Sequence, residues 1–407
     1  MKRDEFDMKG FKEELTAHIL PFWINFMVDD ENGGFYGRMD GHDRLIKDAS
    51  KGAVLNARLL WTFSAAYRLL KTPVYLEMAK RAYNYICKYF IDPVYGGVYW
   101  ELDCKGNPIN RKKQIYAQGF ALYGFTEYYR ATKDITALER AKQLFELIEE
   151  HKDRQYGGYF EAFTDDWKPI DDMRLSDKDA NEKKSMNTHL HILEPYTNLF
   201  RVWPDEHLKV AQQELITIFL NHILNAETRH LELFFDERWN KKSSIISFGH
   251  DIEASWLLYE AAQVLGDSRM IKIVMPVSIE IAMAALEGLE SDGSMVYESE
   301  FGRKDMDRHW WVQAESIVGF MYAYKNSENI LFKEKACDVW NYVQQRLIDA
   351  ETGEWYWSIY ADNTVNRMDD KAGFWKCPYH NSRMCMEMME HFFQEEKDKS
   401  LWLHGHY

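Results

Sequence analysis

The sequence predicts an all-α protein folded as an (α/α)6 barrel, a closed double ring of six helical hairpins with short β-like turns. Three observations support this fold class. A glycine-rich motif recurs along the chain, the repeats number six, and helices with one charged face alternate with helices that are apolar nearly all round. A chain of 407 residues could also hold two or three ordinary domains. The repeats instead favour one catalytic barrel domain over residues 1–407.

The repeated motif combines an acidic residue, a Gly-Gly pair and alternating aromatic residues. Its clear copies have their glycine pairs at Gly33–Gly34, Gly96–Gly97 and Gly157–Gly158. Weaker copies are anchored at Leu231, Gly293 and Gly353, so that successive copies lie 60 to 74 residues apart. Such periods indicate stacked supersecondary units. An open α-solenoid is the alternative, but the lack of polar capping repeats favours a closed ring.

Each unit is expected to contain a helix, a turn and a second helix. Residues 137–150 and 331–347 have apolar side chains three and four apart and one charged face, which is typical of a helix with one side in water. The second helices carry only one to three charges each: residues 54–70, 115–129, 186–200, 251–265 and 312–324. A helix that is apolar nearly all round is buried on both sides. We therefore expect the first helices in an outer ring and the second helices in an inner ring.

The composition excludes several classes of protein. Asp and Glu total 65 against 50 for Lys and Arg, and a net charge of −15 repels phosphate backbones, so no nucleic-acid partner is expected. No apolar run has the length of a signal peptide or a membrane span. The five scattered cysteines, without CxxC spacing, are typical of reduced thiols. We expect a cytoplasmic monomer without a membrane partner, in which the 15% aromatic residues partly line a binding surface.

The unusual polar and aromatic residues fall at or near the starts of the inner helices. They are Arg58, Tyr116, Asn187, His189, His191, His250, Glu253, Trp310, Trp311, Glu315, Trp375 and His380. Inner helices of a closed ring run parallel, so their N-termini meet at one mouth of the barrel. We therefore expect these side chains to surround one cavity.

The histidines of this set have different expected surroundings. His189 and His191 are two apart on a helix, so at most one of them faces the cavity. His250 and Glu253 are three apart and share a helix face, which predicts a carboxylate beside the imidazole. His380 follows Pro378 at a helix start, where the helix dipole depresses the pKa of an imidazole.

Metal and nucleotide cofactors are not expected. No HxxxH or HExxH motif occurs, and neither GxGxxG nor GxxxxGK[ST] is present. The GGFYG segment at residues 33–37 is a turn rather than a phosphate cradle.

Two kinds of sugar chemistry suit such a cavity. Glycoside hydrolysis needs two carboxylates, which Glu253 and Glu315 could supply, but it leaves the histidines unused. Proton abstraction next to a sugar carbonyl needs bases that titrate near neutrality and a cation beside the developing enediolate. Histidines and Arg58 supply both, so the second chemistry is favoured.

Several motifs resemble those of the N-acylglucosamine 2-epimerase superfamily. They are NGGFYG, YGGVYW, KSMNTHLHILE, FGHDIEASWL, WWVQAE and KCPYHNSRMCME, and the resemblance runs from about residue 11 to residue 390. Within the superfamily the likeness is greatest to the members that act on β-1,4-linked disaccharides. The resemblance implies an (α/α)6 barrel and reversible epimerisation at C2 of the reducing-end glucose of cellobiose or lactose. There the ring opens, a base removes the C2 proton, and the cis-enediolate is reprotonated from the other face.

The resemblance also implies roles for individual residues. His250 and His380 match the acid/base pair, and His191 rather than His189 matches the histidine associated with ring opening. Arg58 matches the arginine over the reacting oxygens. The residues that match sugar-binding positions are Tyr116, Asp179, Asn187, Glu253, Trp311 and Trp375, with Trp375 under the second sugar and Asp179 on a loop that aligns less closely. Glu315, four residues after Trp311, is a further candidate sugar-binding residue.

Three alternatives remain at this point. The chain could be a sister isomerase acting on free mannose or on N-acylglucosamine, a glycoside hydrolase or lyase on the same barrel, or a non-catalytic binding protein. A long leucine heptad would favour the last of these, and the sequence contains none.

Overall fold

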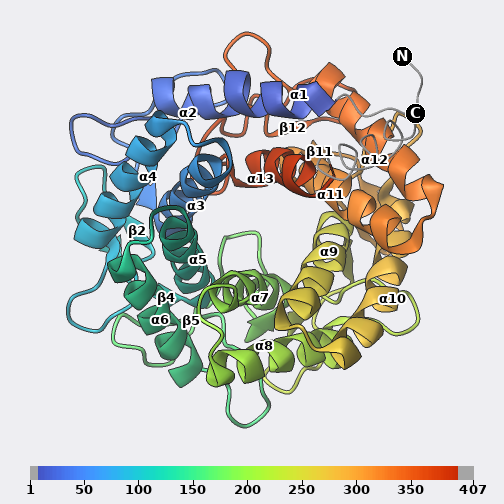
Figure 1. Cartoon of the computed structure of the whole chain (residues 1–407), viewed down its shortest axis with the longest axis horizontal. Helices are drawn as coiled ribbons and strands as arrows, with labels where there is room; N and C mark the ends of the chain where they lie inside the picture. Colours follow the sequence, from blue (N-terminus) through green and yellow to red (C-terminus); the bar gives the residue numbers. More distant parts are fainter. Residues whose placement is uncertain (1–7, 393–407) are drawn as a thin grey trace, which may run out of the picture.

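The computed structural model describes residues 8–392, in which two concentric rings of helices form a closed barrel (Figure 1). The expected domain limits at residues 1 and 407 lie outside this part. The inner ring consists of α3 (Ala53–Leu70), α5 (Ile115–Thr132), α7 (Met186–Phe200), α9 (Phe248–Leu265), α11 (Trp310–Ser327) and α13 (Tyr379–Glu387). The all-α class and the barrel architecture predicted from the repeats are confirmed.

The outer ring covers the inner ring with one helical segment per repeat. It consists of α1 (Met8–Glu13) and α2 (Leu20–Phe26), joined by η1 (Glu14–Ile19), then α4 (Pro73–Tyr85), α6 (Ile135–Glu150), α8 (Glu206–Ile218), α10 (Ser268–Ala285) and α12 (Ile330–Tyr342). Short segments extend these helices: η2 (Ile86–Phe90), η3 (Phe219–Ile223), η4 (Leu286–Gly288), η5 (Val343–Leu347) and, on the inner ring, η6 (Met388–Phe392). The last inner helix, α13, packs against both α3 and α11 and so closes the ring.

Helix burial follows the charge pattern of the sequence. Fourteen of the 18 residues are buried in each of α3, α5 and α9, whereas α6 buries seven of its 16 residues, all apolar except Glu149. Both observations agree with the expected inner and outer positions. Within residues 8–392, no helix combines the length and the apolar character that crossing a membrane requires.

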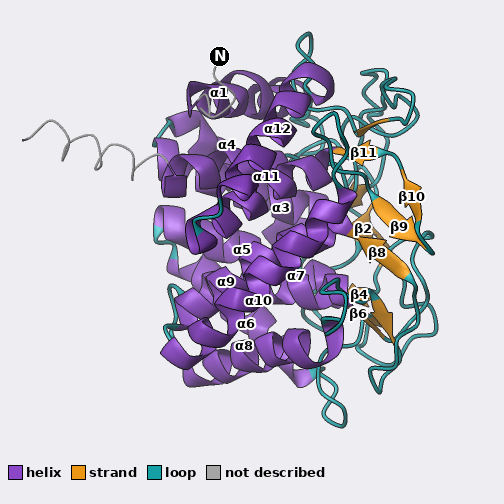
Figure 2. Ribbon diagram, turned by 90° about the vertical axis from the view of Figure 1, so that its right-hand side faces the viewer, coloured by secondary structure: helices purple, strands orange, loops and turns teal. Residues whose placement is uncertain are grey.

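Short antiparallel strands gather at one end of the barrel (Figure 2). Two three-stranded sheets contain β1 (Lys51–Gly52), β2 (Glu101–Leu102) and β3 (Pro108–Asn110), and β8 (Ile245–Ser247), β9 (Glu298–Glu300) and β10 (Arg303–Asp305). Three two-stranded pairs contain β4 (Lys113–Gln114) with β5 (Ala162–Phe163), β6 (Lys184–Ser185) with β7 (Phe234–Phe235), and β11 (Arg308–His309) with β12 (Ser358–Ile359). Five strands lead directly into inner helices, so this end holds the N-termini of the inner ring.

The Gly-Gly repeats are the turns that anchor these strands. In the first copy, Asp29 accepts hydrogen bonds from the backbone N–H groups of Glu31 and Asn32, and its other oxygen lies 2.6 Å from Nζ of Lys51. Gly34 has a φ of +65°, and a Cβ there would lie 2.6 Å from the ring of Tyr85, so glycine is required. The same buried pairing joins Asp92 to Lys113 and Asp153 to Lys184. Each turn is thereby fixed to the strand that begins the next inner helix.

Candidate active site

A cavity of about 420 Å³ opens among the N-termini of the inner helices. All the predicted site residues except Glu315 line it: Arg58, Tyr116, Asp179, Asn187, His191, His250, Glu253, Trp311, Trp375 and His380. Further lining residues come from the loops of the same end, including Tyr297, His309, Trp357 and Asp369. The expectation that the parallel inner helices bring these side chains to one mouth agrees with this geometry.

His189 and His191 have separate environments, as their spacing predicted. The Nδ1 atom of His189 lies 2.7 Å from the carbonyl oxygen of Ser185, and its Nε2 atom accepts the backbone N–H of Tyr159. Both nitrogens are therefore used within the core. His191 lines the cavity, and its Nδ1 atom lies 2.6 Å from a carboxylate oxygen of Glu194.

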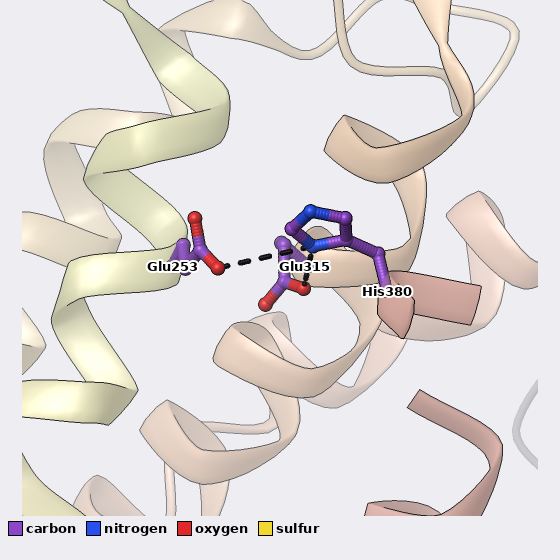
Figure 3. Close-up of side chains that lie close together, drawn as sticks. All are labelled: Glu253, Glu315 and His380. Carbon is purple, nitrogen blue, oxygen red and sulfur yellow. Dashed lines mark hydrogen bonds and ion pairs between the residues drawn. The ribbon is translucent and has the colours of Figure 1, made fainter. Parts of the chain in front are cut away.

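His380 is held by Glu315. Its Nδ1 atom lies 2.7 Å from Oε1 of Glu315 and 3.8 Å from Oε1 of Glu253 (Figure 3). Against the effect of burial, Arg383 and His380 lower the pKa of Glu315, so this carboxylate is ionised and can only accept. Nδ1 of His380 must then carry the proton, which leaves the lone pair on Nε2. Burial lowers the pKa of His380 to about 3, although Glu315 opposes the shift. The depressed pKa expected from the helix start is found, with burial as its main cause.

His250 does not pair with Glu253, and that prediction is wrong. Its Nδ1 atom lies 2.8 Å from Oγ of Ser247, three residues earlier in the chain. Glu253 instead binds Arg383, and its side chain reaches the cavity without touching the ring of His250. Burial lowers the pKa of His250 to about 3, and the nearby His191 and His380 add to the shift. The imidazole is therefore neutral; the charge of Glu315 opposes the shift, but no carboxylate among the described residues hydrogen-bonds to the ring.

A buried arginine that sequence reasoning left without a role connects the carboxylates. Nη1 of Arg383 donates to Glu194 over 2.5 Å, while Nη2 donates to Oε1 of Glu253 over 2.6 Å and to Oε1 of Glu315 over 2.7 Å. Arg383 thus supports the partners of both His191 and His380. Against burial, Arg383 and His191 lower the pKa of Glu194 to about 2.

Glu253 differs from the other two glutamates. Burial and the charge of Glu315 raise the pKa of Glu253 well above its usual value, and its Oε2 atom is buried without a hydrogen-bond partner in the described chain. This oxygen lies 4.0 Å from Nε2 of His191. A neutral carboxyl group at this position can donate a hydrogen bond to a ligand oxygen in the cavity.

Glu253, Glu315 and His380 form the one group in residues 8–392 with the spacing of a metal site. Their ligand atoms lie within 4.8 Å of one another. However, Nη2 of Arg383 donates to an oxygen of each glutamate, so this arginine already places a positive charge against both side chains. The donor set therefore does not fit a metal ion while Arg383 keeps this position.

Arg58 contributes a buried positive charge without an ion pair. Its Nη2 atom donates to the hydroxyl of Tyr116 over 2.9 Å, and its Nε atom has no partner in the described chain. The guanidinium lies over the rings of Phe120 and Tyr379, 4.3 Å and 4.9 Å from their centroids. No carboxylate among residues 8–392 lies within ion-pair distance of it. A cation in this state is suited to a negative charge that develops on a ligand.

Aromatic and amide groups surround these ionisable residues. The ring of Trp311 packs 4.7 Å from that of His250, and Trp375 stands edge-on to Tyr116 at 5.9 Å. Asn187 has a buried Oδ1 atom without a partner in the described part, which leaves it available to a ligand. Asp179 lies on a loop at the mouth, where its carboxylate accepts from the backbone and hydroxyl of Ser176.

The arrangement suits proton transfer at carbon better than hydrolysis by two carboxylates. Glu253 and Glu315 share one guanidinium nitrogen, and only Glu253 reaches the cavity wall, so they cannot flank a glycosidic bond. In contrast, four imidazoles, three of them predicted from the sequence, and Arg58, which has no ion pair among the described residues, line a single space. This combination can remove a proton beside a carbonyl and stabilise the resulting oxyanion.

Sequence reasoning missed the residues that support the histidines. They are Glu194, Ser247, Arg383 and Tyr379, whose hydroxyl donates to Glu194 over 2.5 Å. Glu194 could have been found from its position three residues after His191 on the same helix. No sequence pattern pointed to Arg383, because its partners lie on other helices. Ser247 was not recognised because a serine before a helix usually caps the backbone.

Comparisons with known proteins show the family of the chain. The model of the N-acylglucosamine 2-epimerase (GlcNAc 2-epimerase) family matches residues 34–383. The chain is 54% identical over 391 residues to a protein of Bacteroides fragilis named cellobiose 2-epimerase, covering 95% of this chain and 99% of the relative. A cellobiose 2-epimerase of Ruminococcus albus is 41% identical, with 93% and 97% covered. The solved structure of cellobiose 2-epimerase from Bacillus thermoamylovorans superposes with a TM-score of 0.90 at 43% identity, covering 94% of this chain and 98% of the other.

Proposed function

The chain belongs to the N-acylglucosamine 2-epimerase family, and we propose that it is a cellobiose 2-epimerase. In this proposal it reversibly converts the reducing-end glucose of β-1,4-linked disaccharides, such as cellobiose and lactose, into mannose. The names of its relatives place them among carbohydrate epimerases, as the sequence motifs had indicated. The observation that carries the proposal is the meeting of the imidazoles of His191, His250 and His380 in one cavity with Arg58, which has no ion pair among the described residues.

The proposed reaction begins with opening of the sugar ring, which exposes an aldehyde at C1. We assign this step to His191, whose Nδ1 atom is fixed by Glu194 and whose Nε2 atom is left for the sugar. The neutral carboxyl of Glu253, with its free Oε2 atom 4.0 Å from His191, is positioned to donate to a sugar oxygen in the same region.

The central step is proton transfer at C2. One of His250 and His380 removes the C2 proton through Nε2, the electron pair of the C–H bond forms the C1–C2 double bond, and negative charge moves to O1. Arg58 stabilises the resulting cis-enediolate. The other histidine takes up a proton from solvent, delivers it to the opposite face of C2 and restores the aldehyde with inverted configuration, while the first histidine returns its proton to solvent. Because the carboxylate of Glu315 hydrogen-bonds to His380 whereas the partner of His250 is a serine hydroxyl, His380 is the better candidate for the member that takes up this proton.

The remaining residues are assigned to binding. Tyr116 and Asn187 hold the reducing-end sugar, Trp311 provides an aromatic wall beside His250, and Trp375 supports the second sugar. Asp179 is placed at the mouth, where the non-reducing end would lie. Glu315 acts through His380 rather than by touching the sugar, since it does not line the cavity.

We include in the proposal that the enzyme is a cytoplasmic monomer without cofactor, with one catalytic domain spanning the chain. The position of Arg383 between the carboxylates supports independence from metal. Incubation of the purified protein with cellobiose, followed by chromatographic separation of the epimers, tests the activity. The proposal requires a disaccharide with mannose at the reducing end, and release of free glucose would favour the hydrolase alternative.

A further inference from the structure

Ser247 and Ser185 occupy the same position in two repeats but use their hydroxyl groups differently. Each is the residue that precedes an inner helix, Ser185 before α7 and Ser247 before α9. Oγ of Ser185 accepts the backbone N–H of Thr188 over 3.0 Å, the usual bond of a serine at a helix start. Ser247 makes no such bond, and its Oγ lies 2.8 Å from Nδ1 of His250. The hydroxyl serves the imidazole in place of the helix backbone.

We propose that Ser247 is a positioning residue for the epimerisation, which holds the ring of His250 so that Nε2 points to the sugar. The inference rests on the proposed function and adds a residue to its machinery. Ser247 is fully buried and does not line the cavity, so it can act on the reaction only through His250.

A hydroxyl has a different effect from the carboxylates that hold the other two histidines. Glu194 and Glu315 favour the charged forms of His191 and His380, whereas a neutral serine fixes the orientation of His250 without stabilising its charge. His250 therefore loses an acquired proton more readily than His380. The two proton-transferring residues are unequal because their partners on Nδ1 are unequal.

Around His250, the charged or titratable groups come from three other inner helices. They are His191 from α7, His380 from α13 and Glu315 from α11. None of them hydrogen-bonds to Nδ1 of His250; within residues 8–392 the hydroxyl of Ser247 is its hydrogen-bond partner, and the ring of Trp311 packs beside the imidazole.

The first test compares Ser247→Ala with Ser247→Thr and with Ser255→Ala. Ser255 is a matched control because it is buried on the same helix, and its hydroxyl binds only the carbonyl of Ile252. A poorly held imidazole should lower kcat for cellobiose by about tenfold or more, since small misplacement of a reacting group is costly. KM should stay near the parent value, because Ser247 does not touch the cavity. Threonine should restore most of kcat, and Ser255→Ala should leave both constants unchanged.

The second test does not depend on activity. In protein with ¹⁵N-labelled histidine, the Nδ1 signal of His250 is assigned by its loss in His250→Asn. It should show a hydrogen-bonded nitrogen in the parent and in Ser247→Thr, and it should move in Ser247→Ala.

A parent spectrum without a hydrogen-bonded Nδ1 would overturn the inference even if Ser247→Ala fails to fold. A folded Ser247→Ala variant with parent kcat would overturn it as well. If the parent does not epimerise cellobiose at all, the proposed function fails with it, and the spectrum still shows whether the serine holds the ring. An active parent with an indifferent Ser247 removes this inference alone.

Discussion

His250 and His380 face one cavity but are held by chemically different groups, a serine hydroxyl 2.8 Å from Nδ1 of His250 and a carboxylate oxygen 2.7 Å from Nδ1 of His380. A carboxylate stabilises an imidazolium, whereas a hydroxyl orients the ring without this charge effect. A proton taken up during turnover is therefore held more firmly by His380 than by His250. An enzyme that removes a proton from one face of a carbon and adds another to the opposite face can use such an unequal pair.

Replacing either histidine by Asn should reduce net epimerisation by at least about 10²-fold, the lower range for a positioned acid or base. The two variants should differ in solvent exchange. Each should still exchange the C2 proton of the epimer that faces its surviving base, glucose in one variant and mannose in the other. Deuterium uptake at C2 without inversion, followed by NMR in D2O, measures this. Exchange of the same epimer by both variants would contradict the two-base assignment, and His191 would become the next candidate.

Trp375→Ala should affect disaccharides more than monosaccharides. Trp375 lies at the mouth, edge-on to Tyr116 and 5.9 Å from Trp100, and stacking of a second sugar on an indole should contribute about 1 kcal/mol. We expect KM for cellobiose to rise about fivefold, with a smaller change for glucose. Steady-state kinetics with cellobiose and with glucose measures both KM values. An equal rise in the two KM values would mean that the second sugar does not bind on Trp375.

Activity should survive exhaustive chelation and should not need nucleotide. The group of described residues with metal-site spacing, Glu253, Glu315 and His380, already has Arg383 bound to its carboxylates. Dialysis against EDTA followed by the cellobiose assay tests this. Loss of activity that one divalent ion restores would be incompatible with the account.

Acid should destabilise the fold through its buried histidines. The pKa of His250 and of His380 is lowered to about 3 in the folded state, against 6.5 for the free side chain. Between these values the unfolded chain binds more protons, so stability is full above pH 6.5 and falls as the pH drops toward 3. Each such histidine contributes a slope of up to about 1.4 kcal/mol per pH unit. Urea unfolding at pH 7 and pH 5 should therefore show a weaker pH dependence for His250→Asn than for the parent. An unchanged dependence would mean that His250 is not held neutral by burial.

The architecture could be predicted from the sequence because the two rings differ in charge. Helices of the buried inner ring carry few charged residues, and helices of the outer ring carry a charged face toward water. The predicted inner helix at residues 186–200 coincides with α7, and the others differ from the structure by a few residues at their ends. The cavity lining was also accessible, since parallel inner helices bring their N-termini together. Spacing within one helix correctly separated His189 from His191.

Contacts between helices were not accessible in this way. The rule that residues three apart share a helix face holds for His191 and Glu194 but fails for His250 and Glu253. Glu253 is drawn instead to Arg383, which arrives from another helix, and that choice depends on packing and charge balance in three dimensions. Periodicity along one helix cannot report which of several nearby partners a buried side chain selects.

The most direct test of the two-base epimerase is incubation of the parent enzyme with cellobiose in D2O, with no added metal or nucleotide. The account predicts that the disaccharide stays intact and that its reducing-end glucose and the mannose formed from it both acquire one deuterium at C2. Mass spectrometry and NMR of the separated epimers would show this. Cleavage to free glucose, or a mannose product that keeps the original C2 hydrogen, would contradict it.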